Sequence, residues 1–393
     1  MTEKELARQA DGTPEPGVHS GADYAIPAET AALIREAVPE NTALAYRSRW
    51  RSFAAWCRGA GRVALPATAQ TVAAYLTHLA VDRGLKATTA DAHLTAIRAV
   101  HRGAGAPPPD GLAARKVVVA AQRREAAREG RYGPRKAVPV MAADLPAIVA
   151  ACDPRTAAGL RDRAVILLGF ALLARRAELA ALSVSDIEHV RGEGLAVTIR
   201  ASKTDQSARG VVRRIHYASA AALCPVRAVL AWLEYLAARG VTAGPLFTRV
   251  DRWGNLGAGA GGRYAAPGGA PEALTAGPGA EGDDDAGPRA LAGRDGRLRP
   301  QAIGDIVAAA CAVAELTGAG GPAGPASPSA APGERRYSGH SLRRGGATSM
   351  LKAGAQPLNV SRHGRWADGS RAFAGYVEEA TGFGDANPTK GLL

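Results

Sequence analysis

Two short segments carry side chains whose types and spacing suit work on a phosphate. Arg175 and Glu178 are three residues apart, a spacing at which a helix places a carboxylate where it can orient a guanidinium. His340 and Arg343 have the same spacing, in what the sequence predicts to be the first turn of a helix. The exposed N–H groups of a helix N-terminus favour an anion, so these two side chains would form a cradle for a phosphate. Either pair alone is more often an ordinary ion pair or helix cap.

A third segment places Trp366 ten residues before Tyr376, which lies on a short helical stretch. Tyrosine at such a position is usually structural. Its hydroxyl becomes a candidate nucleophile only when the three segments are considered together.

Together the three segments resemble the tyrosine recombinase, or phage integrase, family. The R-x-x-E-L box of that family is matched at 175–179, its H-x-x-R box at 340–343, and its Trp and Tyr by Trp366 and Tyr376. A polar S-K-T-D-Q turn at 202–206 resembles the turn that carries the catalytic lysine of the family, here Lys203. The resemblance covers about 30–393, apart from Gly-rich insertions, and the boxes occur in the family's order.

The resemblance implies a set of catalytic roles. Tyr376 would attack the phosphodiester, giving a 3′-phosphotyrosyl enzyme and a free 5′ hydroxyl. Two guanidinium groups would neutralise the charge of the pentacoordinate transition state without a metal, so neither a metal nor another cofactor is expected. The expected catalytic residues are Arg175, Lys203 (general acid), His340, Arg343, Trp366 and Tyr376, supported by Glu178.

Some assignments stay open in the sequence. Arg176 and Arg344 are adjacent to the two expected arginines, and only the spacing to Glu178 and His340 selects the first of each pair. The interval between the Trp and the Tyr is one residue longer than the family pattern. It is compatible with a shifted helix start, or with His363 in the role of the Trp.

The charge of the chain suggests a polyanionic partner. The 393 residues contain 49 Lys and Arg, of which 42 are Arg, against 36 Asp and Glu, for a net charge of +13. Residues 1–40 have a net negative charge, so residues 41–393 carry a larger positive charge than the whole chain. Double-stranded DNA is the simplest partner, although genomic base bias would also enrich Arg. The expected DNA contacts outside the catalytic set are Arg47, Arg51, Lys116, Arg123 and Arg124.

Other classes of protein are disfavoured. The longest apolar run, Ala164 to Ala174, has 11 residues, whereas a membrane span needs about 20. The first residues lack the apolar core of a secretory signal, and the four cysteines have no paired spacing for zinc or disulfides. We expect a cytoplasmic, nucleoid-associated protein without membrane contacts.

The predicted fold is mainly α with a small β-hairpin. Apolar periodicity predicts four helices before 128, the first capped by Asn41 or Thr42, and a buried helix from Arg161 to Leu182. Alternation of apolar and polar side chains predicts a β-hairpin from Leu195 to Tyr217. The expected organisation is a disordered tail (1–28), a helical core-binding domain (29–128), a linker (129–137) and a catalytic domain (138–393) with Gly/Pro-rich insertions at 254–300 and 318–334.

The sequence therefore predicts a site-specific recombinase that acts on paired DNA sites as a homo-oligomer, expected to be a tetramer, with accessory DNA-bending proteins as possible partners. Two alternatives remain: a catalytically silent DNA-binding relative, and a nicking enzyme similar to type IB topoisomerases. The latter shares the chemistry but would act as a monomer on unpaired sites.

Overall fold

A computed structural model describes residues 25–36, 38, 40–130, 137–200, 210–257, 296–316 and 337–382. The chain divides into two compact units, Met1–Pro134 and Arg135–Leu393. Most of the predicted tail, the turn with Lys203, most of the first Gly/Pro-rich insertion and all of the second lie outside the described residues. Within the described part, no helix has the length and apolar character needed to cross a bilayer.

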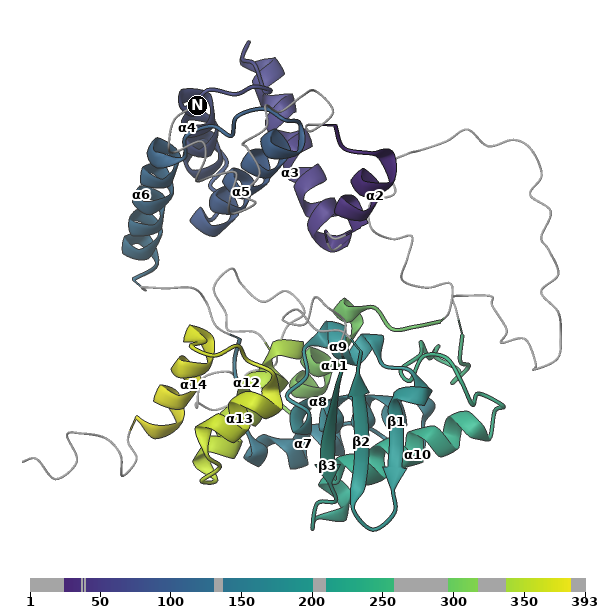
Figure 1. Ribbon diagram of the computed structural model, residues 1–393. Coiled ribbons are helices and arrows are strands. Elements are labelled where there is room, and N and C mark those ends of the chain that lie inside the picture. The colour runs from purple at the N-terminus through teal and green to yellow at the C-terminus, as the bar shows by residue number, and fades with distance from the viewer. Residues whose placement is uncertain are drawn as a thin grey trace, which may run out of the picture. The chain divides into compact units, whose positions relative to one another are not determined.

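The first unit is built from helices alone in its described part (Figure 1). They are α2 (Ala28–Glu36), α3 (Glu40–Gly59), α4 (Ala69–Thr77), a π-helical turn (His78–Asp82), α5 (Ala87–Gly103) and α6 (Leu112–Glu129). Helix α3 begins at Glu40, so the prediction that Asn41 or Thr42 caps it is wrong. Both residues lie inside the first turn, because the helix extends further toward its N-terminus than its apolar pattern.

Aromatic rings form much of the core of this unit. The rings of Phe53 and Tyr75 lie 5.0 Å apart between centroids, and both side chains are buried. Polar groups in the core are paired: the Tyr75 hydroxyl lies 3.0 Å from Nδ1 of His93, and Nε2 of His101 accepts a hydrogen bond from the backbone of Ala67. The basic residues proposed to contact DNA are instead exposed, two on α3 and three on α6: Arg47, Arg51, Lys116, Arg123 and Arg124.

The second unit combines eight described helices with a three-stranded sheet. The helices are α7 (Leu145–Ala150), α8 (Ala157–Ala171), α9 (Arg176–Ala181), α10 (Pro225–Ala237), α11 (Pro300–Val313), α12 (Gly339–Lys352), α13 (Pro357–Gly364) and α14 (Arg371–Thr381). The antiparallel sheet has the order β1 (Ile187–Val190), β2 (Gly194–Ile199), β3 (Val211–His216). The predicted fold class, mainly α with a small sheet, is confirmed.

The sheet packs on the helices mainly through β2. The apolar side chains of β2 share one core with residues of α8 and α10. Val197 pairs with Ile187 of β1 and with Arg213 of β3. Strands β2 and β3 match the predicted hairpin, whereas β1 was not predicted, because three of its four residues are exposed and leave no apolar alternation.

The predicted helix from Arg161 to Leu182 is two helices, α8 and α9, so that prediction is wrong. The chain leaves α8 after Ala171, and Leu173 adopts a left-handed conformation with φ of 50°. Leu172 and Leu173 are buried like helix residues, which explains the misleading apolar run. The break frees their carbonyl groups and places Arg175 at the start of α9.

The first Gly/Pro-rich segment is shorter than predicted. Leu256 and Leu298, inside the predicted range 254–300, are buried in the core of the unit. The ends of the segment lie next to each other: the backbone of Arg249 donates to the carbonyl of Gly296 and accepts from the N–H of Gly257. The predicted insertion thus leaves and re-enters the fold at neighbouring points.

Candidate active site

The candidate site is built around helix α12, which packs unusually close to its neighbours. A Cβ added at Gly345 would lie 1.6 Å from the carbonyl oxygen of Val140, and one at Gly346 would lie 2.6 Å from that of Phe170. The Gly-Gly pair therefore lets the helix approach both backbones. The side chain of Ser338 caps the helix by accepting from the N–H of His340. The Gly-Gly pair was a signal in the sequence for this close approach, and the sequence analysis missed it.

Arg343 points from α12 into the protein and is 1% exposed. Its Nη1 donates to the carbonyl of Leu173, freed by the break between α8 and α9. Its Cζ lies 3.9 Å from the centroid of the Trp366 ring. Burial, and then the charge of Arg175, lower the pKa of Arg343 to about 9, so the group remains charged at neutral pH.

The second terminal nitrogen of Arg343, Nη2, has no hydrogen-bond partner among the residues that the structure describes, although it is buried. Leaving a buried donor without a partner costs about 1–3 kcal/mol, and more for a charged group. A donor in this state is suited to an incoming anionic oxygen, which would satisfy it.

His340 and Tyr376 lie next to Arg343 and contact each other. Nε2 of His340 is 3.1 Å from the hydroxyl of Tyr376, which is buried on α14. Burial raises the pKa of Tyr376 above its usual value, although Arg343 opposes this effect. The His340 ring keeps an exposed edge. Burial of its other atoms and the charges of Arg343 and Arg175 lower its pKa, so a neutral imidazole faces the phenol and can accept its proton.

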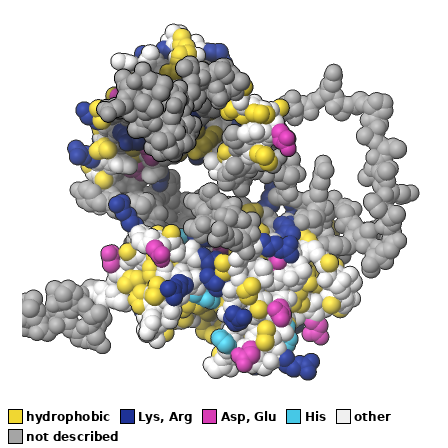
Figure 2. All heavy atoms as spheres, viewed as in Figure 1, with side chains coloured by type: hydrophobic (Ala, Val, Ile, Leu, Met, Phe, Trp, Pro, Cys, Tyr) yellow, Lys and Arg dark blue, Asp and Glu magenta, His cyan; other side chains and the backbone are white. Residues whose placement is uncertain are grey.

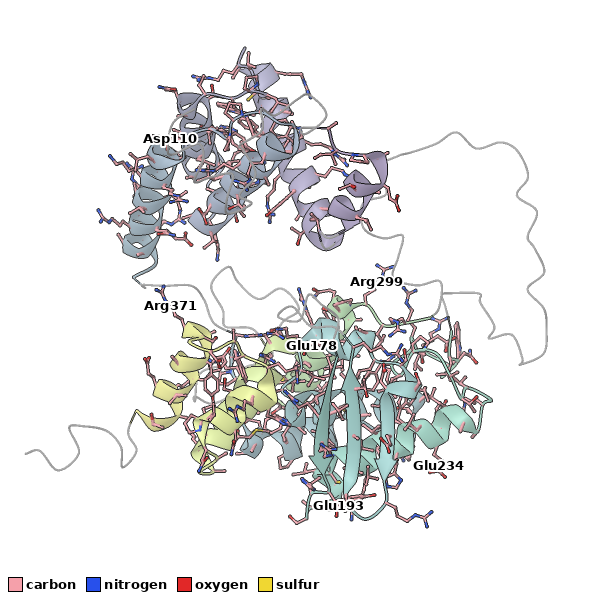
Figure 3. The ribbon with its side chains drawn as sticks, viewed as in Figure 1. Asp110, Glu178, Glu193, Glu234, Arg299 and Arg371 are labelled. Atoms are coloured by element: carbon pink, nitrogen blue, oxygen red, sulfur yellow. The ribbon has the colours of Figure 1, made fainter. Side chains whose placement is uncertain are left out.

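Arg175 lies at the start of α9 and is held by Glu178. Its backbone N–H donates to Oε2 of Glu178 at 2.9 Å, and its Nη1 donates to Oε1 at 2.6 Å. Glu178, which is labelled in Figure 3, is buried, and burial alone would raise the pKa of its carboxyl group. The nearby guanidinium of Arg365 and the hydrogen bonds from Arg175 outweigh burial, and the pKa of Glu178 is lowered. The carboxylate is therefore charged at neutral pH.

Trp366, rather than His363, lies beside the other candidate residues. Its ring meets that of Tyr376 edge-on, with 5.7 Å between centroids. His363 lies against α8, with Nε2 2.8 Å from the carbonyl oxygen of Ala171. A Cβ added at Gly364 would lie 1.8 Å from the Trp366 ring, so only glycine fits beneath it.

The geometry also separates the adjacent arginines. Arg176 donates to Oε1 of Gln301 on α11 at 3.1 Å, away from Tyr376. Arg344 pairs with Glu379 on α14 at 2.6 Å. Arg176 and Arg344 thus pair with side chains outside the candidate set, whereas Arg175 pairs with Glu178.

Arg365 belongs to the same cluster and was missed by the sequence analysis. It is buried, and its Nη2 donates to Oε2 of Glu178 at 2.7 Å. Its backbone has φ of 61°, a left-handed conformation that costs a side chain other than glycine about 1–2 kcal/mol. Nothing in the sequence marks it, because this conformation normally predicts Gly or Asn.

The remaining predicted residues are not part of the cluster described above. Lys203 lies outside the described residues, between the end of β2 at Ile199 and the start of β3 at Val211. The five basic residues proposed for DNA contact belong to the first unit, and Lys and Arg side chains are visible on both units (Figure 2). Within the described ranges, no group of His, Cys, Asp or Glu is arranged to hold a metal.

No family model matches the sequence, which is similar to two proteins described as recombinases. It is 28% identical over 357 residues to an integrase/recombinase described as a XerD homolog, from Selenomonas ruminantium, covering 90% of this chain and 85% of the relative. It is 29% identical over 182 residues to the recombinase Cre of Escherichia phage P1, covering 46% of this chain and 52% of Cre.

The fold is similar to that of a lambda integrase dimer bound to a COC′ core site. The TM-score is 0.50 at 14% sequence identity, over 89% of this chain and 93% of the integrase chain. At this identity the likeness concerns the fold.

Proposed function

Because the chain belongs to the tyrosine recombinase family, we propose that it is a site-specific DNA recombinase whose nucleophile is Tyr376. The observation that carries the assignment of the site is the buried, unpartnered Nη2 of Arg343 beside the contact between His340 and Tyr376. A nucleophile, a base and an unsatisfied cation converge there, as phosphoryl transfer requires.

In the first step, the Tyr376 hydroxyl attacks a phosphorus of the DNA backbone. Its proton passes to Nε2 of His340, whose pKa is lowered by burial and then by the charges of Arg343 and Arg175. Negative charge grows on the non-bridging oxygens, where Nη2 of Arg343 and the free edge of Arg175 donate. The indole N–H of Trp366 supplies a further donor.

The P–O bond to the 5′ oxygen then breaks and leaves a 3′-phosphotyrosyl enzyme. We assign Lys203 as the acid that protonates the leaving 5′ oxygen, on the resemblance of its turn to that of the family. Rejoining reverses the step: a 5′ hydroxyl attacks the phosphotyrosine and releases the phenol. The covalent bond conserves the energy of the phosphodiester, so no nucleotide is consumed.

Strand exchange between two duplex sites defines the assembly that we propose. Each chain supplies one nucleophile, and exchange of two duplexes requires four strand cleavages, so four copies act together. The exposed basic residues of α3 and α6 would bind phosphates of each site. The protein would then act on the DNA of the nucleoid, in the cytoplasm, with accessory DNA-bending proteins as further proposed partners.

A nicked duplex that loses its 5′ end on cleavage traps the covalent complex. We expect a protein–DNA adduct with the unaltered protein, in excess EDTA and without ATP, because Arg175 and Arg343 supply the positive charge. Tyr376→Phe should form no adduct, and the control Tyr337→Phe should form one. Absence of any adduct would favour the silent DNA-binding alternative. Relaxation of supercoiled DNA without exchange between paired sites would favour the topoisomerase-like alternative.

A further inference from the structure

We propose that Arg365 is a positioning residue that holds Arg175 in place through the carboxylate of Glu178. This inference rests on the proposed function, because the group being positioned is one of the two arginines assigned to the phosphate. The relay runs from the turn between α13 and α14, through a buried carboxylate, to the start of α9.

The contacts of Glu178 form the relay. Oε2 accepts from Nη2 of Arg365 at 2.7 Å, and Oε1 accepts from Nη1 of Arg175 at 2.6 Å. The side chains of Arg365 and Glu178 are 5% and 3% exposed, whereas that of Arg175 is 24% exposed. The inner pair is therefore shielded from water, and the outer arginine keeps an open edge for a ligand.

Arg365 is also anchored independently of Glu178. Its Nη1 donates to the carbonyls of His363 and Leu172, at 3.1 and 3.3 Å. These bonds connect the end of α13 to the break that separates α8 from α9. The left-handed backbone at Arg365 directs the side chain into the protein, and a strained residue kept in a buried ion pair is typical of a functional constraint.

The carboxylate of Glu178 also offsets the repulsion among three neighbouring arginines. Arg175, Arg343 and Arg365 repel one another, and the carboxylate of Glu178 attracts all three. Without Arg365, one carboxylate oxygen would remain buried with less positive charge beside it. The pKa of Glu178 would rise, and a protonated Glu178 would hold Arg175 only weakly.

Several charged and titratable groups lie around Glu178, and they determine how the activity should depend on pH. Glu178 is surrounded by Arg175 at the residue before α9, Arg343 on α12 and Arg365 at the residue after α13. Arg213 on β3 and His363 on α13 lie near Arg365. His340 faces Arg343 and Arg175 and sets the acid limb of the unaltered protein.

The test compares the pH dependence of adduct formation on the nicked duplex. Arg365→Met should slow adduct formation roughly 10- to 100-fold at neutral pH, as expected for a misplaced catalytic group. The pKa of Glu178 should rise by about 1–3 units, the effect of removing an adjacent opposite charge, so the acid midpoint should move above the one that His340 sets in the unaltered protein. Arg365→Lys should restore part of both losses. Adding Glu178→Gln to Arg365→Met should return the midpoint to that of the unaltered protein, because position 178 then no longer titrates.

Arg213→Met is the matched control. Arg213 donates to the carbonyls of Arg362 and His363 at the end of α13, and not to Glu178. Its loss should leave the acid midpoint unchanged. If Arg365→Met does not fold, Arg365→Gly provides the same test, because glycine adopts φ of 61° without strain.

Thermal melting provides a measurement that needs no DNA. In Arg365→Met, a raised pKa of Glu178 means that stability falls as the pH rises through that pKa. The loss of Tm relative to the unaltered protein should therefore be larger at pH 8 than at pH 5. Two results would overturn the relay while leaving the proposed function intact, provided that the unaltered protein forms the adduct normally. The first is an equal loss of Tm in Arg365→Met at pH 5 and pH 8. The second is an acid midpoint of adduct formation in Arg365→Met that equals that of the unaltered protein. No adduct with the unaltered protein at any pH would overturn the proposed function, and with it the catalytic role of Arg365.

Discussion

Two buried arginines, Arg343 and Arg365, lie in neighbouring regions of the second unit and differ in how their donors are used. Arg343, on α12, keeps Nη2 without a hydrogen-bond partner in the described part of the chain. Arg365, in the turn after α13, donates to a carboxylate and to backbone carbonyls. Arg343 thus keeps a donor for a ligand, whereas Arg365 holds the groups around it in place.

The comparison shows that burial of an arginine does not by itself indicate its role. An unpartnered buried donor stores an unfavourable free energy that a ligand can relieve, whereas a buried ion pair fixes a geometry. We call the first the phosphate-facing region (Arg175, His340, Arg343, Trp366 and Tyr376) and the second the support region (Glu178 and Arg365). The predictions below separate them.

The largest expected difference is between activity and stability in the phosphate-facing region. Arg343→Met should reduce adduct formation about 10²- to 10³-fold, the usual cost of losing one transition-state donor. The free energy of unfolding should fall little or rise, because a buried charge with an unpartnered donor is removed. Adduct kinetics and urea unfolding measure the two effects. Arg344→Met is the control, since Arg344 pairs with Glu379 and should lose little activity. A large loss of stability in Arg343→Met would show that Arg343 is structural.

The pH dependence of the unaltered protein should follow His340. Burial and then Arg343 lower its pKa below 6.5, so cleavage should be level near pH 7–8 and fall roughly tenfold per pH unit below that pKa. Stability should change in the same direction. The unfolded chain binds a proton near pH 6.5 that the folded His340 does not, so folding weakens as the pH falls through 6.5. Glutamine is neutral at every pH, so in His340→Gln the cleavage rate should be low and should not change with pH. If the fall in rate at low pH remained, a group other than His340 would cause it.

A smaller effect is expected where Trp366 packs on the backbone. In Gly364→Ala the new Cβ would meet the indole at 1.8 Å, so the ring must leave its present position over Arg343. We expect a loss of about 1–3 kcal/mol in the free energy of unfolding and a several-fold slower cleavage. Gly304→Ala in α11 is the control, because its Cβ would make only ordinary contacts, the nearest at 3.6 Å. Equal behaviour of the two variants in denaturant titrations would contradict the packing described for Trp366.

The smallest effect is expected far from both regions, in the Gly/Pro-rich segment. Gly257 and Gly296 both bond to the backbone of Arg249, so a short linker can replace residues 262–290. Because loop-closure entropy changes only with the logarithm of length, the free energy of unfolding should change by less than about 1 kcal/mol. Thermal melting and adduct formation would both detect an unexpected contribution. Loss of activity without loss of stability would show that this segment contacts DNA or a partner.

The two regions also differ in how far the sequence predicts them. Arg343 and His340 lie on a regular helix, where a spacing of three residues translates directly into a shared face. The apolar run before Arg175 predicted burial correctly but helix incorrectly, because burial of Leu173 says nothing about its φ of 50°. Arg365 depends on a single left-handed residue and on a partner 187 positions away, and neither leaves a local pattern.

The central claim is that Tyr376 is the nucleophile of the phosphate-facing region, and the most direct measurement is to identify the residue linked to DNA. Trypsin cleavage of the trapped adduct after Arg371 and Lys390 yields a peptide, 372–390, in which Tyr376 is the only tyrosine. We predict that mass spectrometry finds the 3′ phosphate on this peptide. A nucleotide linked to the peptide 337–343, which contains Tyr337, or to a peptide of the first unit, would contradict the account.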